Sequence, residues 1–127
     1  MNQMIGIMSR ALDASSLRQK SISNNIANVN TPYFKPSKVS FEELLQQEVK
    51  GQFIGNRTHS KHVQIGETSR LPSPKLEQEN IVFQNSGNGV DLDYEMSKLS
   101  ENTIWYQSLT YGLNEEFNLL KTAIRAR

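Results

Sequence analysis

The chain has 127 residues, a formal net charge of +1, 36% apolar residues, 21% charged residues and no cysteine. This composition excludes a disulfide scaffold and a cysteine zinc site, and a nucleic-acid-binding protein would need a clear excess of cations. No stretch of 18 apolar residues occurs, so no direct membrane span is expected. The low apolar share predicts a small core.

Residues that break helices divide the chain into three parts. All four prolines and five of the seven glycines lie between residues 32 and 89. Long helices are therefore expected only at the two ends. We predict an N-terminal helix with an Asn-rich segment over 1–35, a short helix with irregular chain over 36–90, and a C-terminal helix over 91–127.

The N-terminal segment is predicted to be helical from about residue 3 to residue 29. Apolar side chains recur there at alternating steps of three and four, which is typical of a coiled-coil seam. The apolar seam residues are Ile5, Met8, Leu12, Ile22, Ile26 and Val29. Ser15 and Gln19 occupy the same seam as polar layers, and Thr31 followed by Pro32 ends the helix.

The middle of the chain carries weaker signals. Residues 40–43 read Ser-Phe-Glu-Glu, a capping box that predicts a short helix with Phe41, Leu44, Leu45 and Val49 on its apolar face. The chain from residue 51 to residue 89 is expected to be an irregular loop. Its extended runs at 62–65 and 81–84 indicate at most a small β-hairpin.

The C-terminal segment repeats the coiled-coil spacing over a greater length. Its seam consists of Leu92, Met96, Leu99, Tyr106, Leu113, Phe117, Leu120 and Ile124, with Thr103 and Thr110 as polar members. Asp91 is the expected N-cap, and the cations Lys121 and Arg125 lie at the negative end of the helix dipole. The predicted fold class is mainly α, with two long helices packed as a coiled-coil-like hairpin or bundle.

The polar seam positions and the charges suggest how the helices are used. The N-terminal helix is mildly basic and the C-terminal helix is acidic, so their flanks are complementary. Polar seam residues specify register and oligomeric state at a cost in stability, which favours further helices as partners, either copies of the chain or near relatives. Alternatively, these polar residues simply face solvent in a small bundle.

Catalysis, cofactor binding and metal binding have little support. His59, His62 and Glu67 form the only group that resembles metal ligands, and a firm fourth ligand is missing. A metal-dependent enzyme using the two histidines is therefore a remote hypothesis. No nucleophile, base and orienting residue can be assembled, so we expect no enzymatic activity and no cofactor.

A longer motif lies at the end of the N-terminal helix. It consists of Ser23, Asn24, Asn25, Ile26, Ala27, Asn28, Val29, Asn30, Thr31 and Pro32. This motif resembles the N-terminal signature of bacterial flagellar axial proteins, which include rod, hook and hook-associated subunits. The C-terminal helix, with Val90-Asp91-Leu92-Asp93 at its start, resembles that of the proximal members of the basal-body rod protein family.

The resemblance implies a structural subunit that self-assembles through its terminal helices into a tubular shaft. This shaft, the proximal rod, would transmit torque and surround the export channel. The implied partners are copies of the chain, other rod proteins, and the adaptor that joins the rod to the membrane ring and the export apparatus. Export without a cleaved signal and an extracytoplasmic place, in the periplasm or the cell-wall zone, are also implied. The alternative is a soluble helical binding module such as an export chaperone.

The motif departs from the family pattern at one position. Family members often have glycine and then tyrosine after Thr-Pro, whereas Tyr33 and Phe34 follow here. Glycine allows a positive φ, which Tyr33 would adopt only with strain. The geometry of this turn is therefore not transferred from the family.

Overall fold

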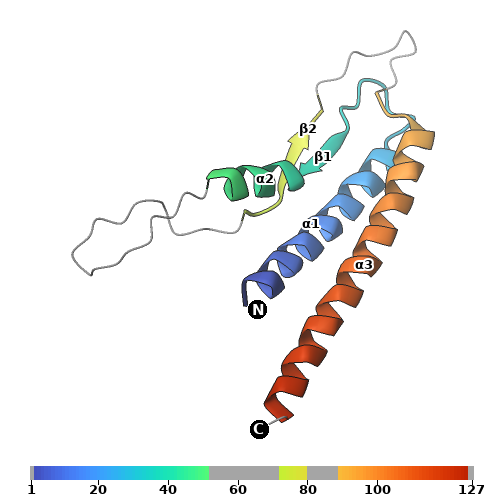
Figure 1. Cartoon of the computed structure of the whole chain (residues 1–127). Coiled ribbons are helices and arrows are strands. Elements are labelled where there is room, and N and C mark those ends of the chain that lie inside the picture. The colour runs from blue at the N-terminus through green and yellow to red at the C-terminus, as the bar shows by residue number, and fades with distance from the viewer. Residues whose placement is uncertain (1, 52–71, 80–88, 126–127) are drawn as a thin grey trace.

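The computed structural model describes residues 2–51, 72–79 and 89–125. The elements in chain order are α1 (Asn2–Ala27), β1 (Ser37–Ser40), α2 (Glu42–Gly51), β2 (Lys75–Gln78) and α3 (Leu92–Arg125). The long helices α1 and α3 lie side by side in opposite directions, and α2 and the strands lie beside α1 (Figure 1). The prediction of a mainly α fold with a helical hairpin is confirmed. Within the described part of the chain, no helix is long and apolar enough to cross a bilayer.

Local side-chain chemistry explains where the long helices begin and end. The Asp91 carboxylate accepts hydrogen bonds from the backbone amides of Asp93 and Tyr94, at 3.0 and 3.2 Å, so the predicted N-cap is confirmed. At the end of α1, the Asn28 side-chain amide donates to the Asn24 carbonyl at 2.8 Å. The Asn24 carbonyl also accepts the backbone amide of Asn28 at 3.2 Å, so the side chain adds a second bond at the last turn of the helix.

A two-stranded antiparallel sheet joins segments that are far apart in the sequence. Ser37 lies opposite Gln78, and Ser40 lies opposite Lys75. The small β-structure predicted between the long helices is therefore present, but at other residues than expected, because each strand has only four residues and only Val39 among them is buried. The extended runs predicted at 62–65 and 81–84 lie outside the described residues.

The apolar core is small, as the composition predicts. Ala11 and Ala14 of α1 pack with Phe41, and the partly buried Leu45 and Leu109 complete the cluster. The predicted short helix is confirmed as α2, which supplies Leu45, and Phe41 immediately precedes it. The core therefore joins α1, α2 and α3 at one level of the hairpin.

The turn after α1 places Tyr33 at a φ of 58°. This is the left-handed region, which disfavours residues with a Cβ by about 1 to 2 kcal/mol. Tyr33 thus adopts the positive φ that was expected to cost it strain at this position.

Replacing Tyr33 separately by glycine and by alanine should isolate this strain. Both changes remove the side chain, but only alanine keeps a Cβ. We expect Tyr33→Gly to exceed Tyr33→Ala in free energy of unfolding by about 1 kcal/mol, measured by urea denaturation. Equal stability of the two variants would show that the φ of 58° is relaxed in solution.

Candidate assembly surface

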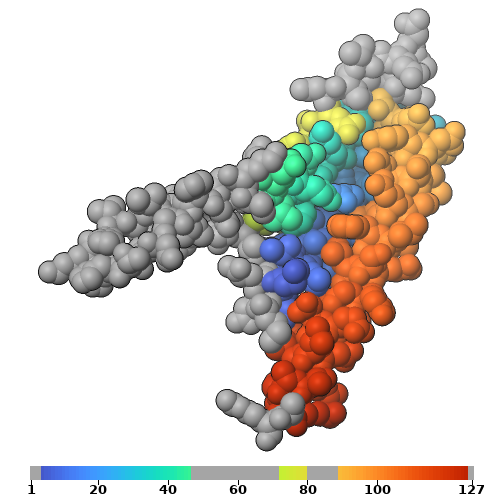
Figure 2. Space-filling model, in the orientation of Figure 1, coloured from blue at the N-terminus to red at the C-terminus, as the bar shows by residue number. Residues whose placement is uncertain are grey.

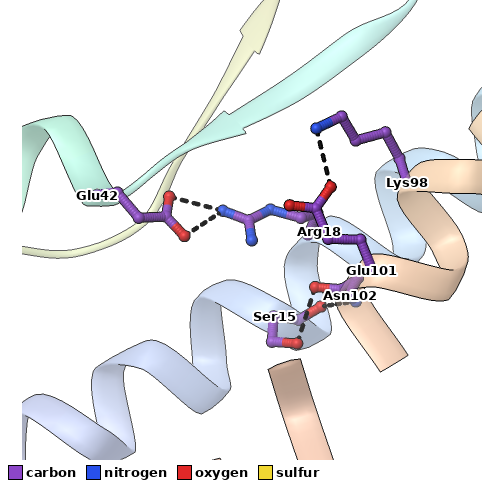
Figure 3. Close-up of polar contacts among 6 residues, drawn as sticks. All are labelled: Ser15, Arg18, Glu42, Lys98, Glu101 and Asn102. Carbon is purple, nitrogen blue, oxygen red and sulfur yellow. Dashed lines mark hydrogen bonds and ion pairs between the residues drawn. The ribbon is translucent and has the colours of Figure 1, made fainter. Parts of the chain in front are cut away.

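A polar layer lies at the middle of the α1–α3 interface (Figure 3). The Ser15 hydroxyl donates to the Asn102 side-chain oxygen at 2.9 Å. The Asn102 amide in turn donates to the Ser15 carbonyl at 3.0 Å and to the Gln19 side-chain oxygen at 3.3 Å. Ser15 and Asn102 are buried. The polar seam positions of the N-terminal helix therefore contact the other helix rather than solvent alone.

The corresponding positions predicted in the C-terminal helix do not contribute to this layer. Thr103 and Thr110 are exposed, and their hydroxyls donate to the carbonyls of Leu99 and Tyr106 in the same helix. The face of α3 turned toward α1 instead includes Glu95, Asn102 and Leu109, which are seven residues apart. The spacing of apolar residues did not predict this face, because two of its three members are polar.

A second polar layer surrounds Asn25, which is 2% exposed. Its side-chain amide donates to the Ser37 carbonyl and to the Glu95 carboxylate, both at 2.9 Å, and its oxygen accepts the Ser37 amide at 3.0 Å. The Ser21 hydroxyl also donates to the Ser37 carbonyl, at 2.6 Å. One asparagine of the signature thus ties α1 to both β1 and α3.

Glu95 is a buried acid in this layer, with 6% of its surface exposed. Burial raises the pKa of its carboxyl, the hydrogen bond from Asn25 lowers it, and the carboxylates of Glu79 and Asp91 raise it further. The net effect is a raised pKa, because desolvation of the charged carboxylate is the largest of these contributions. The charged Glu95 therefore costs the isolated subunit stability at neutral pH.

This pKa shift predicts a pH dependence of folding. Because the pKa of Glu95 is raised on folding, the folded chain holds its proton at a pH where the unfolded chain has released it. The stabilisation that protonated Glu95 gives the folded chain is complete below the ordinary carboxyl pKa of 4.5. It is lost as the pH rises through the folded-state pKa.

Glu95→Gln tests this dependence, because glutamine keeps an acceptor for Asn25 but carries no charge. We expect it to raise the free energy of unfolding at pH 7 and to reduce its dependence on pH between 4.5 and 7, measured by denaturation at several pH values. A variant less stable than the parent at pH 7 would contradict the assignment.

Figure 3 shows two ion pairs together with the Ser15–Asn102 layer. Arg18 of α1 donates to both carboxylate oxygens of Glu42 of α2 at 2.7 Å, and Lys98 pairs with Glu101 at 2.9 Å. In the described part of the chain, neither ion pair joins α1 to α3. The predicted complementary charges of the two long helices therefore do not form these ion pairs. Arg18 of the basic helix α1 pairs with α2 instead. Partly exposed pairs of this kind contribute little stability.

The residues of the predicted apolar seams fall into three classes of exposure. Ile22 is buried. The half-buried members are Ile5, Met8, Leu12, Ile26, Val29, Leu99, Leu113 and Leu120. The exposed members, all on α3, are Leu92, Met96, Tyr106, Phe117 and Ile124. The seam of the N-terminal helix is thus largely covered within the subunit, whereas five of the eight seam residues of α3 remain exposed.

Further apolar side chains are exposed on other sides of α3. Ile104 and Tyr111 are 65% and 70% exposed. Tyr111 and Phe117 are six positions apart, which places them about 120° apart around the helix. A helix that is apolar on several sides is typical of one surrounded by other elements.

The signature residues divide between internal bonds and the surface. Asn25 and Asn28 make the hydrogen bonds described above, and Thr31 donates to Asn28 at 3.3 Å. The exposed members are Ser23, Asn24, Ala27, Asn30, Thr31 and Pro32. Capping and turn chemistry therefore accounts for part of the motif.

Sequence reasoning missed the small residues that let the helices approach. Ala11 and Ala14 are buried, and a Cβ added at Gly112 would lie 3.4 Å from the Met8 methyl group. The signal was present in the spacing of the two alanines, three apart on one helix face.

Comparison with known proteins gives the family. A family model described as "Flagella basal body rod protein" matches residues 7–35. The flagellar basal body rod protein FlgB of Bacillus subtilis is 39% identical over 117 residues, which cover 92% of this chain and 89% of that protein. FlgB of Borrelia hermsii is 38% identical over 95% of both chains, and FlgB of Aeromonas hydrophila is 30% identical over 98% of this chain and 94% of that protein. The chain belongs to the FlgB family of flagellar basal body rod proteins.

Membership in the FlgB family supports a structural role in the rod of the basal body. The predicted resemblance to rod proteins is confirmed, and the alternative of an export chaperone is not favoured. His59, His62 and Glu67, the candidate metal ligands, lie outside the described residues.

Proposed function

We propose that the chain is a subunit of the proximal rod that assembles through its terminal helices into a tube. The observation that carries the proposal is the exposed apolar seam of α3, formed by Leu92, Met96, Tyr106, Phe117 and Ile124. Burying one such side chain against a neighbour contributes on the order of 1 to 2 kcal/mol. The five together favour association with other helices.

The internal interface supports the same proposal. The two long helices meet through the Ser15–Asn102 and Asn25–Glu95 layers, whose hydrogen bonds specify register more than they add stability. A subunit built in this way keeps a defined shape while most apolar surface of α3 remains available. A tube of such subunits would enclose the export channel and transmit torque.

The proposed partners are copies of the chain, other rod proteins, and the adaptor and export apparatus at the rod base. The subunit would pass to its extracytoplasmic site through the flagellar export apparatus. We assign it no enzymatic role, in line with the structural character of its family.

The proposal is tested by placing a charge in the α3 seam. Phe117 is half exposed in the subunit, so Phe117→Asp should leave folding intact but bury a carboxylate in the assembled rod. We expect cells carrying this variant to lose swimming and to yield basal bodies without rods, scored by motility in soft agar and electron microscopy.

Asn118→Asp is the matched control, because it adds the same charge one residue later on another side of the helix. We expect control cells to swim normally, with circular dichroism showing that both variants remain helical. Normal rods with Phe117→Asp would contradict the proposed use of this seam.

A further inference from the structure

An open groove of about 600 Å³ lies between α1 and α3, beside the Ser15–Asn102 layer. Among the described residues that line it, Lys20 alone is charged, and the others are hydroxyl side chains, amides and the ring of Tyr106. Tyr106 is 47% exposed and belongs to the open seam of α3. The groove is therefore the part of this seam where α1 and α3 together form a concave surface.

The lining of the groove suits an aromatic guest that also carries a hydrogen-bond donor. The ring of Tyr106 can pack edge-to-face with a second ring, and the ammonium group of Lys20 can lie over an aromatic face. The side-chain oxygen of Gln107, which is exposed at the rim, can accept a hydrogen bond. Tryptophan is the side chain that uses all three contacts.

The chain has one tryptophan, and it lies on the side of α3 turned away from the groove. Trp105 is two positions from Thr103 and two positions from Gln107, and both of these residues line the groove. Two positions correspond to about 160° around a helix. Trp105 is 45% exposed. A tryptophan placed in this way is typical of an anchor at a protein interface.

An acidic residue accompanies the tryptophan. Glu101 lies four positions before Trp105, so the two side chains share a face of α3. The Glu101 side chain is 69% exposed, and one of its oxygens is bound to Lys98 at 2.9 Å. A second cation can therefore approach this carboxylate from solvent, and Lys20 is the cation that the groove offers. The two surfaces match in charge as well as in aromatic content.

The groove and the tryptophan lie at the same level of α3. Thr103, Tyr106 and Gln107 of the groove alternate in the sequence with Trp105, so a second copy needs no displacement along the helix axis to bring its tryptophan to the groove. Figure 2 shows α3 along one edge of the molecule, with α2 on the other side of α1. A second copy can therefore approach α3 side by side.

We propose that Trp105 of one copy docks in the α1–α3 groove of a second copy that lies beside it in the same direction. Lys20 then lies against the indole and Glu101, and Gln107 accepts the indole N–H. This contact rests on the proposed function, because it names the partner surface that covers the middle of the α3 seam. It joins two different surfaces at one level, so it places copies side by side around the wall of the tube.

The chain has no cysteine, so paired substitutions test the contact directly. Two differently tagged copies, one with Gln107→Cys in the groove and one with Ser108→Cys on the tryptophan side, are expressed together, and basal bodies are isolated and oxidised. We expect a disulfide-linked adduct that contains both tags. In the control, Thr110→Cys replaces Ser108→Cys, because Thr110 is exposed but lies about 160° away, on the groove side of α3. The control should give at least about ten-fold less adduct.

Removing the anchor provides the second arm. Trp105→Ala in the copy with Ser108→Cys should reduce the adduct about ten-fold. Tyr111→Ala, which removes a 70% exposed aromatic side chain from another side of α3, should leave it within about two-fold of the parent. Lys20→Glu in the groove copy should also reduce the adduct, and Glu101→Lys in the tryptophan copy should restore it.

Side-by-side docking would be overturned by basal bodies that contain rods but no adduct, by an adduct equal to that of the control, or by an adduct only with a different rod protein. If the cysteine pair assembles no rods, Trp105→Ala and Tyr111→Ala are compared in cells without cysteine substitutions. Loss of swimming with Trp105→Ala alone supports docking, and equal motility of the two variants overturns it. Normal rods with Phe117→Asp would instead overturn assembly through the seam.

Discussion

Replacing Asn25 by alanine is expected to lower the free energy of unfolding by about 3 kcal/mol. The change removes three hydrogen bonds at once and leaves the Ser37 amide, the Ser37 carbonyl and the Glu95 carboxylate without this partner. Buried polar groups left without a partner are costly, and Ser21 compensates for only one of them. Urea denaturation followed by circular dichroism measures the loss.

Asn24→Ala is the matched control for this prediction. Asn24 is the neighbouring signature asparagine, and its side chain is exposed and accepts one long hydrogen bond, of 3.3 Å, from Asn28. We expect the control to change stability by less than about 0.5 kcal/mol. Similar losses for the two variants would mean that Asn25 does not organise the layer between α1, β1 and α3.

Phe41→Ala should destabilise the subunit by about 3 to 4 kcal/mol. Phe41 is 3% exposed and is the largest member of the small cluster that joins the three helices. With so few apolar side chains in the cluster, its neighbours have little means to refill the cavity, and the cavity adds to the lost transfer free energy. Thermal and urea denaturation provide the measurement.

Leu76→Ala serves as the control for the core prediction, because Leu76 is 56% exposed on β2. Its expected effect is within about 0.5 kcal/mol of zero. If Phe41→Ala cost no more than Leu76→Ala, the cluster around Ala11 and Ala14 would not be the core of the subunit.

The helices of this fold were accessible from sequence because their signals are local. Apolar side chains three and four residues apart, Pro32 after α1 and Asp91 before α3 each act within a turn or two of their own position. The small core was also foreseeable, since the chain has few apolar residues to bury.

The packing of the helices was not accessible in the same way. The face of α3 that meets α1 is marked by Glu95 and Asn102, which a hydrophobic pattern assigns to solvent. Their burial depends on Asn25 and Ser15, located 70 and 87 positions away in the chain. The strand pair likewise forms between short segments that are far apart in the chain, so no local sequence pattern predicts which residues form it.

The open seam of α3 has a physical explanation in this packing. Because polar layers hold the two long helices, the apolar residues of α3 are distributed around its other sides, with Ile104 and Tyr111 far from the seam residue Phe117. In a solitary protein this arrangement would be a liability, since exposed apolar patches promote association. In the rod assembly proposed above, that association is the expected role of the seam.

Thiol labelling at Phe117→Cys tests this account most directly, because the chain has no other cysteine and the side chain is 50% exposed in the subunit. The rate of reaction with a maleimide is compared between the purified subunit and isolated basal bodies. We expect rapid labelling of the subunit and strong protection in the basal body. Equal labelling rates in the two states would contradict the claim that neighbouring subunits cover the apolar seam of α3.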